Sequence, residues 1–342
     1  MSCCDETTAR VPPTDLSRRT LLKGAAVIAS VLPGAATAQG RSIKLAYCSQ
    51  LLCGVPYEVA RSAGHFKKHG LNVELVYTRG GSAAMQALVG NAVDYAATSL
   101  DVAITAFAKG AAIKRFAVTG RLPLFALVTA PKTADQIKDV GDLQGRTVAV
   151  SGLGNADHAL TLYLLAEAKA DASKVKFATM GVNLLEALRQ GTIDAGLVQE
   201  PALTLLQRSG ARVLVNAMNL DDARRYLGGA YEFMGVAVRA KEMNQRKDEM
   251  VMLTQALTDA LKAMRGMNGG ELIAALPKEM VTGLDTKEFG EIIVRHRDSL
   301  YPEAVDIDLA AANRVAQTLI VGGLLPPGAS ISGLHDTSIV KG

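Results

Sequence analysis

Short apolar runs with β-branched members alternate with segments of helical periodicity along much of this 342-residue chain. Residues 43–48 form one such run, which predicts a strand, and Val59, Ala63 and Phe66 recur at helical spacing in the segment that follows. Strands that alternate with helices indicate parallel pairing, because a parallel neighbour needs a long crossover connection, usually a helix. We therefore expect α/β sheets that are covered by helices.

The predicted strands fall into two series, as expected for a chain longer than most single domains. The first series is expected at residues 43–48, 72–78, 93–97 and 113–118, before a long apolar run at residues 123–130. The second is expected at residues 146–151, 175–178, 193–198 and 212–215, before a further strand at residues 233–239. Residues 244–325 have a helical pattern whose wide apolar stripe belongs in the core. This order predicts two α/β lobes and a C-terminal helical segment.

One phrase occurs in both series. ALVGNAVDYA, which starts at Ala87, aligns with ALRQGTIDAG, which starts at Ala187, and the alignment pairs Asp94 with Asp194. Each copy is expected to be a helix that ends in a glycine-containing turn and leads into a sheet strand. We interpret the phrase as a structural repeat that marks two similar lobes, and its two aspartates as turn or strand-entry residues.

The first 38 residues have the features of an export signal. Arg18-Arg19 precedes an apolar run at residues 24–32, and Ala36-Thr37-Ala38 supplies the small residues of a cleavage site. This arrangement is typical of a twin-arginine signal peptide with the mature chain starting near Gln39. An uncleaved anchor is the alternative, but the run is shorter than the roughly 20 residues of a spanning helix. We therefore expect export to the periplasm.

The charge of the chain excludes few partners by itself. Without residues 1–38 the chain keeps 33 basic and 30 acidic side chains, a net charge of about +3. It has no cluster of five or more lysines and arginines, and its few aromatic residues are scattered. Nucleic acid is therefore not an expected partner.

Two cysteines remain after the signal, Cys48 and Cys53. In an oxidising compartment they could close a small disulfide loop if their Cα atoms come within about 7 Å, or they could stay as two buried thiols. A metal site is not expected, because no histidine or further cysteine lies nearby in sequence to complete four ligands. No cofactor is expected either.

Small and polar residues follow the predicted strands, and they are the candidate binding residues. In open α/β sheets, ligands bind beyond the carboxyl ends of the strands, where loops lead into helix N-termini. The candidate ligand-binding residues in these loops are Ser49, Gln50, Gly81, Ser82, Thr98, Ser99, Arg121, Gly154, Asn155 and Glu200. Helix N-termini favour negative charge, so a small anion such as a sulfonate, carboxylate or nitrate is the expected ligand.

Some of these residues also have a structural interpretation. Gly81-Ser82 could be a plain capped turn, and Arg121 could be solvated or salt-bridged. Glu200, just before a helix, could only complement the helix dipole, and His158 is expected to be a packed or capping residue.

Several catalytic and cofactor motifs are missing. Gly152-Leu153-Gly154 does not continue as a dinucleotide fingerprint, because Asp157 stands where the third glycine should be. There is no Walker sequence and no nucleophile elbow of the G-x-S-x-G type. Cys48 and Cys53 are the only plausible nucleophiles, and each would need a nearby cation or histidine.

AGHFKKHGLNVEL at residues 63–75 and the Gly80-Gly81-Ser82 turn resemble the periplasmic solute-binding proteins of ABC importers. The similar group takes up sulfonates, nitrate, taurine and thiamine precursors. The resemblance continues through residues 145–150 and Glu200-Pro201 to residues 233–242, although His65 replaces the usual aromatic residue. It covers most of the mature chain and does not specify the ligand.

The resemblance implies a two-lobed type II periplasmic-binding fold, in which each lobe is a mostly parallel sheet covered by helices. Lobe 1 would comprise residues 41–128 and 232–342, and lobe 2 would comprise residues 129–231, with two crossover segments between them. The implied protein is a monomer that closes on its ligand and presents it to the permease of an ABC importer. Its ligand-facing positions would include Ser49, Gln50, Ser82, Ser99, Asn155 and Glu200.

Two enzymes of the same fold and one receptor are alternatives. Cys48 or Cys53 and the Thr78-Arg79-Gly80-Gly81 loop are similar to residues of sulfinate-cleaving desulfinases, but neither cysteine matches without a shift and the accompanying histidine is missing. A pyrimidine synthase that uses pyridoxal phosphate fits less well, because its lysine and cysteine-rich segments are not evident. A signalling receptor with the same pair of lobes remains open.

Overall fold

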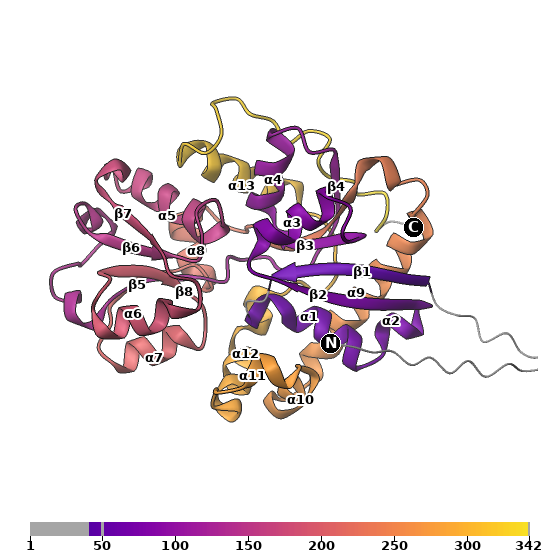
Figure 1. Cartoon of the computed structure of the whole chain (residues 1–342), viewed down its shortest axis with the longest axis horizontal. Coiled ribbons are helices and arrows are strands. Elements are labelled where there is room, and N and C mark those ends of the chain that lie inside the picture. Colours follow the sequence, from indigo (N-terminus) through magenta and orange to yellow (C-terminus); the bar gives the residue numbers. More distant parts are fainter. Residues whose placement is uncertain (1–40, 49–50, 341–342) are drawn as a thin grey trace, which may run out of the picture. The chain divides into compact units, whose positions relative to one another are not determined.

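The computed structural model describes residues 41–48 and 51–340, and Figure 1 shows the order of their helices and strands. The export signal expected at residues 1–38 lies outside this range. In the described part of the chain, no helix has both the length and the apolar character that are needed to cross a membrane. The strands of this part form two five-stranded sheets.

The first sheet has the strand order β2-β1-β3-β10-β4. Its strands are β1 (Arg41–Cys48), β2 (Leu71–Thr78), β3 (Tyr95–Ser99), β4 (Ile113–Val118) and β10 (Met234–Arg239). β1 is parallel to both β2 and β3, whereas β10 is antiparallel to β3 and β4. The helices between the first four strands are α1 (Leu51–Ser62), α2 (His65–Lys68), α3 (Gly81–Val89) and α4 (Leu100–Ala108).

The second sheet repeats this plan with the strand order β7-β6-β8-β5-β9. Its strands are β5 (Ala126–Thr129), β6 (Thr147–Val150), β7 (Lys176–Thr179), β8 (Ala195–Val198) and β9 (Val213–Asn216). β6 is parallel to β7 and β8, and β5 is the antiparallel strand. Its helices are α5 (Ala156–Glu167), α6 (Leu184–Gln190), α7 (Ala202–Arg208) and α8 (Leu220–Leu227).

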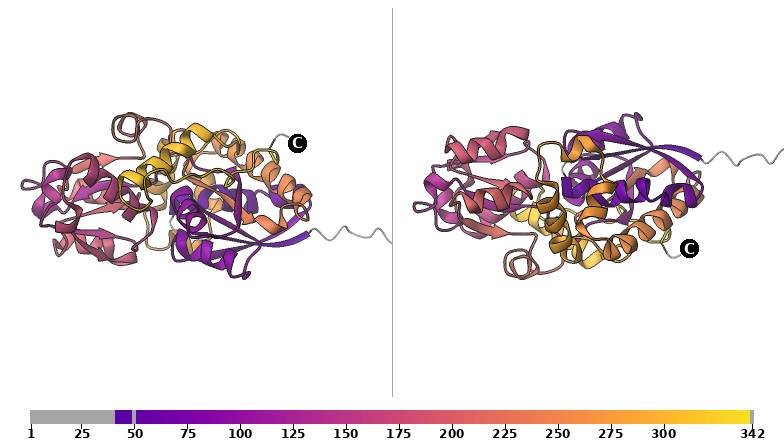
Figure 2. Two further views of the ribbon diagram at one scale, coloured as in Figure 1. Left: turned by 90° about the horizontal axis from the view of Figure 1, so that it is seen from above. Right: turned by 90° about the horizontal axis from the view of Figure 1, so that it is seen from below.

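The C-terminal part of the chain is helical, as its periodicity predicts. It comprises α9 (Lys247–Gly266), α10 (Gly269–Ala275), α11 (Lys278–Val281), α12 (Thr286–Leu300) and α13 (Leu309–Val321). The apolar stripe of α9, which includes Leu253, Leu257 and Leu261, is buried against α1 and α2. α13 packs against α5 and α4, and the added views in Figure 2 show this helix in yellow. The two mixed sheets with helices around them confirm the predicted α/β fold with two lobes.

The helical segment predicted around Val59, Ala63 and Phe66 is interrupted. α1 already begins at Leu51 and ends at Ser62, and α2 starts at His65. Gly64 lies between them with a φ of 74°. This left-handed conformation cannot continue a right-handed helix, and glycine adopts it without steric cost.

The strand predicted at residues 123–130 is shorter and belongs to the second sheet. β5 covers only Ala126–Thr129, although Leu122, Leu124 and Phe125 before it are buried as well. The lobe boundary expected after residue 128 therefore falls inside a strand of the second sheet. α8 was not predicted, because four of its eight residues are charged; Asn219 caps it by accepting hydrogen bonds from the backbone N–H groups of residues 221 and 222.

The repeated phrase forms the same connection in both sheets. The backbone N–H of Asp94 donates to the carbonyl of Lys44 (2.9 Å), and its carboxylate accepts from the Lys44 N–H (2.7 Å). Asp194 makes the same two bonds to Thr147, at 3.0 and 2.7 Å. Each aspartate thus fixes the entry of its strand against the parallel neighbour, β1 or β6. This pairing confirms the structural interpretation of both aspartates.

The turns before these aspartates also correspond. Asn91 (φ 61°) and Gly191 (φ 67°) stand at the same place in the two copies, and both adopt the left-handed conformation. Asparagine tolerates this conformation and glycine adopts it readily, so the two residues can end their helices in the same way.

Two crossover segments connect the sheets and lie side by side. The first runs from β4 to β5, and the second runs from α8 to β10. The N–H of Thr119 donates to the carbonyl of Met234, and the N–H of Phe233 donates to the carbonyl of Gly120, both at 2.8 Å. Since β5 and β10 are antiparallel to their neighbours, both crossovers deliver the chain to the carboxyl ends of the other strands, which is where ligands bind in sheets of this kind.

Candidate ligand-binding site

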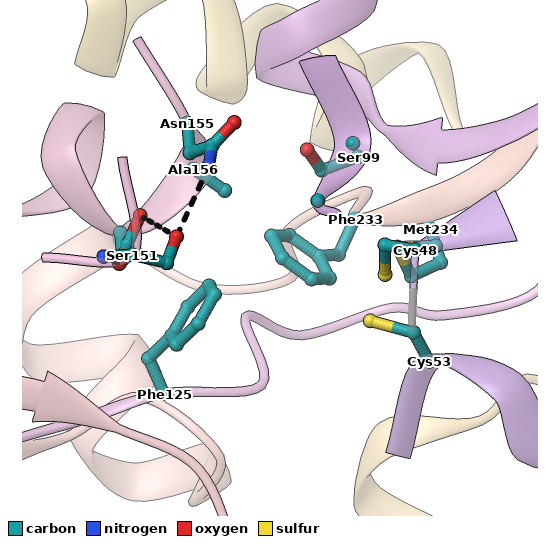
Figure 3. Close-up of a pocket in the computed structure, with 12 residues that line it drawn as sticks. Cys48, Cys53, Ser99, Phe125, Ser151, Asn155, Ala156, Phe233 and Met234 are labelled. Atoms are coloured by element: carbon teal, nitrogen blue, oxygen red, sulfur yellow. Dashed lines mark hydrogen bonds between the residues drawn. The ribbon is translucent and has the colours of Figure 1, made fainter. Parts of the chain in front are cut away.

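A small cavity lies where the carboxyl ends of strands from both sheets meet the two crossovers (Figure 3). Its volume is about 20 Å³, which is enough for about one water molecule. It is lined by Cys48, Cys53, Gly80, Gly81, Ser99, Phe125, Ser151, Asn155, Ala156, Asp157, Phe233 and Met234. A ligand larger than water therefore requires these walls to separate.

A second cavity, of about 230 Å³, adjoins the first on the side of the second sheet. The two cavities share Phe125, Ser151 and Asp157 in their walls. The rest of the second cavity is lined by Leu51, Gly181, Leu184, Leu185, Leu197, Val198, Gln199, Glu200, Pro201 and Ala202. We treat the two cavities as one candidate site.

Loops from the two sheets touch beside the first cavity. The Ser82 hydroxyl donates to Oδ1 of Asn155 at 2.7 Å and lies 3.4 Å from the carbonyl oxygen of Gly154. Asn155 is held in turn by its Nδ2, which donates to the Ser151 hydroxyl at 3.1 Å. Ser82 is the second residue of α3 of the first sheet and Asn155 precedes α5 of the second, so this contact joins the two helix N-termini.

Asp157 is a buried carboxyl group in the wall of both cavities. Its Oδ2 accepts from the backbone N–H of Ser151, and its Oδ1 accepts from the Ser151 hydroxyl and from the N–H of His158, both at 3.0 Å. Burial raises the pKa of Asp157 to about 6, and these hydrogen bonds offset part of the rise. The carboxyl group is therefore largely ionised at pH 7.

Glu200 adds a second acid at the wall of the second cavity. Its carboxylate accepts from the N–H and the hydroxyl of Thr204, both at 3.0 Å, and lies 3.6 Å from Nε2 of His296. Burial acts to raise its pKa, but the interactions with His296 and Thr204 outweigh burial, so the pKa of Glu200 is lowered. Glu200 is therefore ionised at pH 7, and it accepts a hydrogen bond from a backbone N–H near the start of α7.

The candidate residues differ in where the structure places them. Gly81, Ser99 and Asn155 line the first cavity, and Glu200 lines the second. Ser82 and Gly154 form the contact between the loops. Thr98 is fully buried under α3, where a Cβ at Gly81 would collide with the Thr98 hydroxyl. Ser49 and Gln50 lie outside the described residues.

Arg121 does not reach either cavity, which corrects the expectation that it faces the ligand. Its guanidinium donates to the backbone carbonyls of Asp298 and Ser299, near the C-terminus of α12. Free carbonyls at a helix end attract a cation. The physical reason for the difference is therefore that α12, far away in sequence, supplies a partner for this arginine.

Phe125 and Phe233 are site residues that the sequence did not predict. Their rings pack edge to face, with centroids 5.8 Å apart, and both line the first cavity. Each comes just before an antiparallel strand, β5 or β10. The antiparallel direction of these two strands brings the preceding residue to the site, and no local sequence pattern shows that direction.

Cys48 and Cys53 are two free, buried thiols at the wall of the first cavity. Burial raises the pKa of the Cys53 thiol well above its usual value, and the neighbouring Cys48 raises it further. A raised pKa disfavours the thiolate, which is the nucleophilic form. Among the described residues that line the two cavities there is no lysine, arginine or histidine that could activate either thiol.

The chain belongs to the family described as NMT1/THI5 like, which matches residues 55–266. YtlA of Bacillus subtilis (strain 168), which is assigned as a binding protein, is 24% identical over 246 residues, 69% of this chain and 70% of YtlA.

Solved structures show the same fold. A protein from Bordetella bronchiseptica RB50 has a TM-score of 0.80 and 23% identity, covering 89% of this chain and 96% of that protein. The alkanesulfonate-binding protein SsuA from Xanthomonas axonopodis pv. citri, bound to MOPS, has a TM-score of 0.68 and 18% identity, covering 88% and 99%. The CA3427 gene product of Candida albicans, described as having the generic periplasmic binding protein fold, has a TM-score of 0.66 and 16% identity, covering 84% and 92%. The predicted periplasmic-binding fold is thus confirmed.

An enzyme also has a similar fold. The desulfurization enzyme DSZB has a TM-score of 0.59 and 15% identity, covering 88% of this chain and 98% of the enzyme. The fold is therefore compatible with catalysis as well as binding. In this chain burial raises the pKa of the Cys53 thiol, and the described residues that line the first cavity include no lysine, arginine or histidine.

Proposed function

We propose that this protein is an extracytoplasmic solute-binding protein that holds a small ligand between its two lobes and delivers it to an ABC importer. The observation that carries the proposal is the contact between Ser82 and Asn155 beside a cavity with walls from both sheets. A ligand in this place touches both lobes only when they are closed, so binding and closure are coupled. The solute-binding neighbours and the predicted signal at residues 1–38 support this role.

The two sides of the candidate site favour opposite charges. On the side of the first sheet, α3 has no acidic residue in its first turn and its N-cap residue, Gly80, has no capping side chain. On the side of the second sheet, Asp157 and Glu200 already bind N–H groups near the starts of α5 and α7. An anionic group is thus favoured near α3 and opposed near the two carboxylates.

We infer that the ligand carries an anionic or hydrogen-bond-accepting group at one end and a protonated or hydrogen-bond-donating nitrogen at the other. A helix N-terminus contributes about 0.3 to 1 kcal/mol to anion binding. A hydrogen bond to a charged carboxylate contributes about 1.5 to 3 kcal/mol. The carboxylates of Asp157 and Glu200 therefore affect ligand selectivity more than the N-terminus of α3 does. A simple anion is for this reason a poorer ligand than a zwitterion of the same size.

Three matched compounds test this proposal: taurine, ethanesulfonate and ethylamine. Taurine has both end groups, and each of the others lacks one. We expect calorimetry at pH 7 to show the tightest binding for taurine, with a loss of at least about tenfold for ethanesulfonate, since 1.4 kcal/mol corresponds to a factor of ten. Taurine binding should weaken from pH 7 to pH 5, as Asp157 becomes protonated around its pKa of about 6.

Two variants connect the result with the site. Asp157→Asn should weaken taurine binding and leave ethanesulfonate binding nearly unchanged. Glu303→Ala, at an exposed position, is the matched control. Equal binding of taurine and ethanesulfonate would reject the inferred polarity. A screen in which no sulfonate, amine, nitrate, carboxylate or thiamine precursor raises the melting temperature would count against the solute-binding role itself.

A further inference from the structure

Two charged contacts join α7 to α12. In the first, the inner contact, Nε2 of His296 lies 3.6 Å from Oε1 of Glu200, which comes just before α7. In the second, the outer pair, Nη1 of Arg208 donates to Oε2 of Glu288 at 3.1 Å, and Nη2 of Arg208 contacts Oε1 of the same carboxylate. The outer pair is therefore bidentate, a geometry that adds both energy and geometric specificity.

The two helices belong to different lobes (Figure 1). α12 packs against α9 and α10, and both of these pack against α1 of the first sheet. The hydroxyl of Tyr301, directly after α12, donates to the carbonyl of Leu52 in α1 at 2.7 Å. α7 instead follows β8, the central strand of the second sheet, and packs against α6. The contacts of α7 with α12 therefore join the second lobe to the helices of the first.

The two contacts match in spacing and in charge. Glu288 and His296 are eight residues apart on α12, a spacing that keeps two side chains on one face of a helix. Glu200 and Arg208 are also eight residues apart, and they meet the residues of α12 in antiparallel order. An acidic side chain faces a basic one in each contact. This complementarity favours an arrangement in which both contacts are made together.

The inner contact reaches the candidate site through Glu200. Glu200 is buried in the wall of the second cavity, and Thr204 of α7 binds its carboxylate. His296 approaches the same carboxylate from the other lobe, so this contact exists only when the lobes are close together. The contact of Ser82 with Asn155 lies beside the first cavity. The closed form is thus joined beside each of the two cavities.

We propose that the inner contact and the outer pair form a latch that stabilises the closed form before the ligand binds and so increases ligand affinity. The apparent affinity of a protein falls in proportion to the fraction of molecules in the binding-competent form. The latch changes this fraction without touching the ligand. The Arg208 side chain is 63% exposed, so salt should screen the outer pair.

The first experiment measures closure of the ligand-free mature protein by small-angle X-ray scattering. Arg208→Glu and Glu288→Arg each place like charges at the outer pair, and Arg208→Glu/Glu288→Arg restores opposite charges. We expect each single variant to have a larger radius of gyration than wild type, and the double variant to return to the wild-type value. Arg224→Glu makes the same change of charge in an ion pair within α8 and is the matched control. Equal radii in all these proteins would overturn the latch.

The second experiment measures taurine affinity by calorimetry, and this part rests on the proposed function. Exposed ion pairs are weak, so Arg208→Glu and Glu288→Arg should each weaken binding about two- to fivefold, and the double variant should bind within about twofold of wild type. The difference between wild type and Arg208→Glu should shrink when sodium chloride is raised from about 50 to 500 mM. A difference that does not depend on salt would show that the charges of the outer pair are not its cause.

Two further variants test the inner contact. His296→Gln keeps a side-chain N–H that can reach Glu200, whereas His296→Ala removes it. We expect weaker taurine binding in His296→Ala and an affinity close to that of wild type in His296→Gln. Equal affinities in the two variants would exclude the inner contact from the latch.

The outcomes separate the latch from the proposed function. If the single variants at the outer pair weaken taurine binding and the double variant does not recover it, the latch is rejected and the binding function stands. If wild type binds neither taurine nor any other solute in the screen, the proposed function fails, and the radii of the ligand-free proteins still decide whether the latch exists.

Discussion

Asp101 is a buried acid at the start of α4, outside the residues that line the candidate site. Neither of its carboxyl oxygens has a hydrogen-bond partner among the described residues. Burial raises the pKa of Asp101 to about 6; the nearby Ser99 hydroxyl and Arg115 offset part of this rise, and Asp157 adds to it. The ionised form of this residue therefore destabilises the folded protein.

Asp101→Asn should make the protein more stable at pH 7 and less dependent on pH. Because the folded state binds the Asp101 proton more tightly than the unfolded state, the contribution of this group is fully present below about pH 4 and is lost as the pH rises through about 6. Two pKa units correspond to roughly 3 kcal/mol. Urea unfolding at pH 4.5 and 7.5 measures the difference; a variant that is less stable than wild type at pH 7.5 would show that the carboxylate has a favourable partner.

Ser82→Ala and Asn155→Ala should each weaken binding of the best ligand by about 0.5 to 3 kcal/mol, the range for a lost hydrogen bond. Each variant removes one partner of the contact between the loops, so it reduces the population of the closed form that binds. Arg121→Ala should change affinity less than twofold, because its guanidinium binds carbonyls of α12. Calorimetry separates the cases, and a tenfold loss in Arg121→Ala would restore this arginine to the site.

Asp94 and Asp194 each stabilise the pairing of two strands in one of the sheets. Asp94→Ala and Asp194→Ala each leave a backbone N–H of β1 or β6 without its acceptor, so each should cost about 1 to 3 kcal/mol of unfolding free energy. Asp94→Ala should cost more, because Asp94 also pairs with Arg246 at 2.5 Å. Chemical denaturation, with Glu303→Ala as an exposed control, checks both values. Costs no larger than that of the control would show that the two bonds are dispensable.

The elements differ in how far their sequences predict them. The buried strands and the apolar stripe of α9 were predictable, because burial on both faces or along one face leaves a simple pattern. Gly64 breaks a helix whose apolar spacing continues on both sides of it, so periodicity alone did not show the break. The antiparallel direction of β5 and β10 depends on their pairing partners, which no local pattern contains.

The dependence on distant segments also explains why some residues of the candidate site were predicted wrongly or missed. Strand ends located Gly81, Ser99, Asn155 and Glu200 at the cavities, since each lies at the end of its own strand or within five residues of it. The partner of Arg121 and the aromatic pair of the crossovers come from segments more than 100 residues apart. The sequence contains Asp157 and Glu200, but it does not show that both line the same cavity. Their effect on the charge of the ligand could therefore not be predicted.

At the scale of the whole molecule, we predict that export requires the twin arginines. A reporter fused to residues 1–45 should reach the periplasm, and replacing Arg18-Arg19 by two lysines should retain it in the cytoplasm, because the signal is read by a receptor that requires both arginines. Cell fractionation measures the distribution. Unchanged export of the lysine variant would reject the twin-arginine assignment, whatever the protein binds.

The position of β10 between β3 and β4 determines when each sheet can be completed during synthesis. Among the strands of its sheet, β4 pairs only with β10, so the first sheet stays divided until residues 234–239 leave the ribosome. The second sheet is built from one continuous stretch, from β5 to β9, and can close earlier. A fragment of residues 122–229 should therefore unfold cooperatively in urea by circular dichroism, whereas residues 41–121 should not. In this chain the half that is translated first is the half that is finished last.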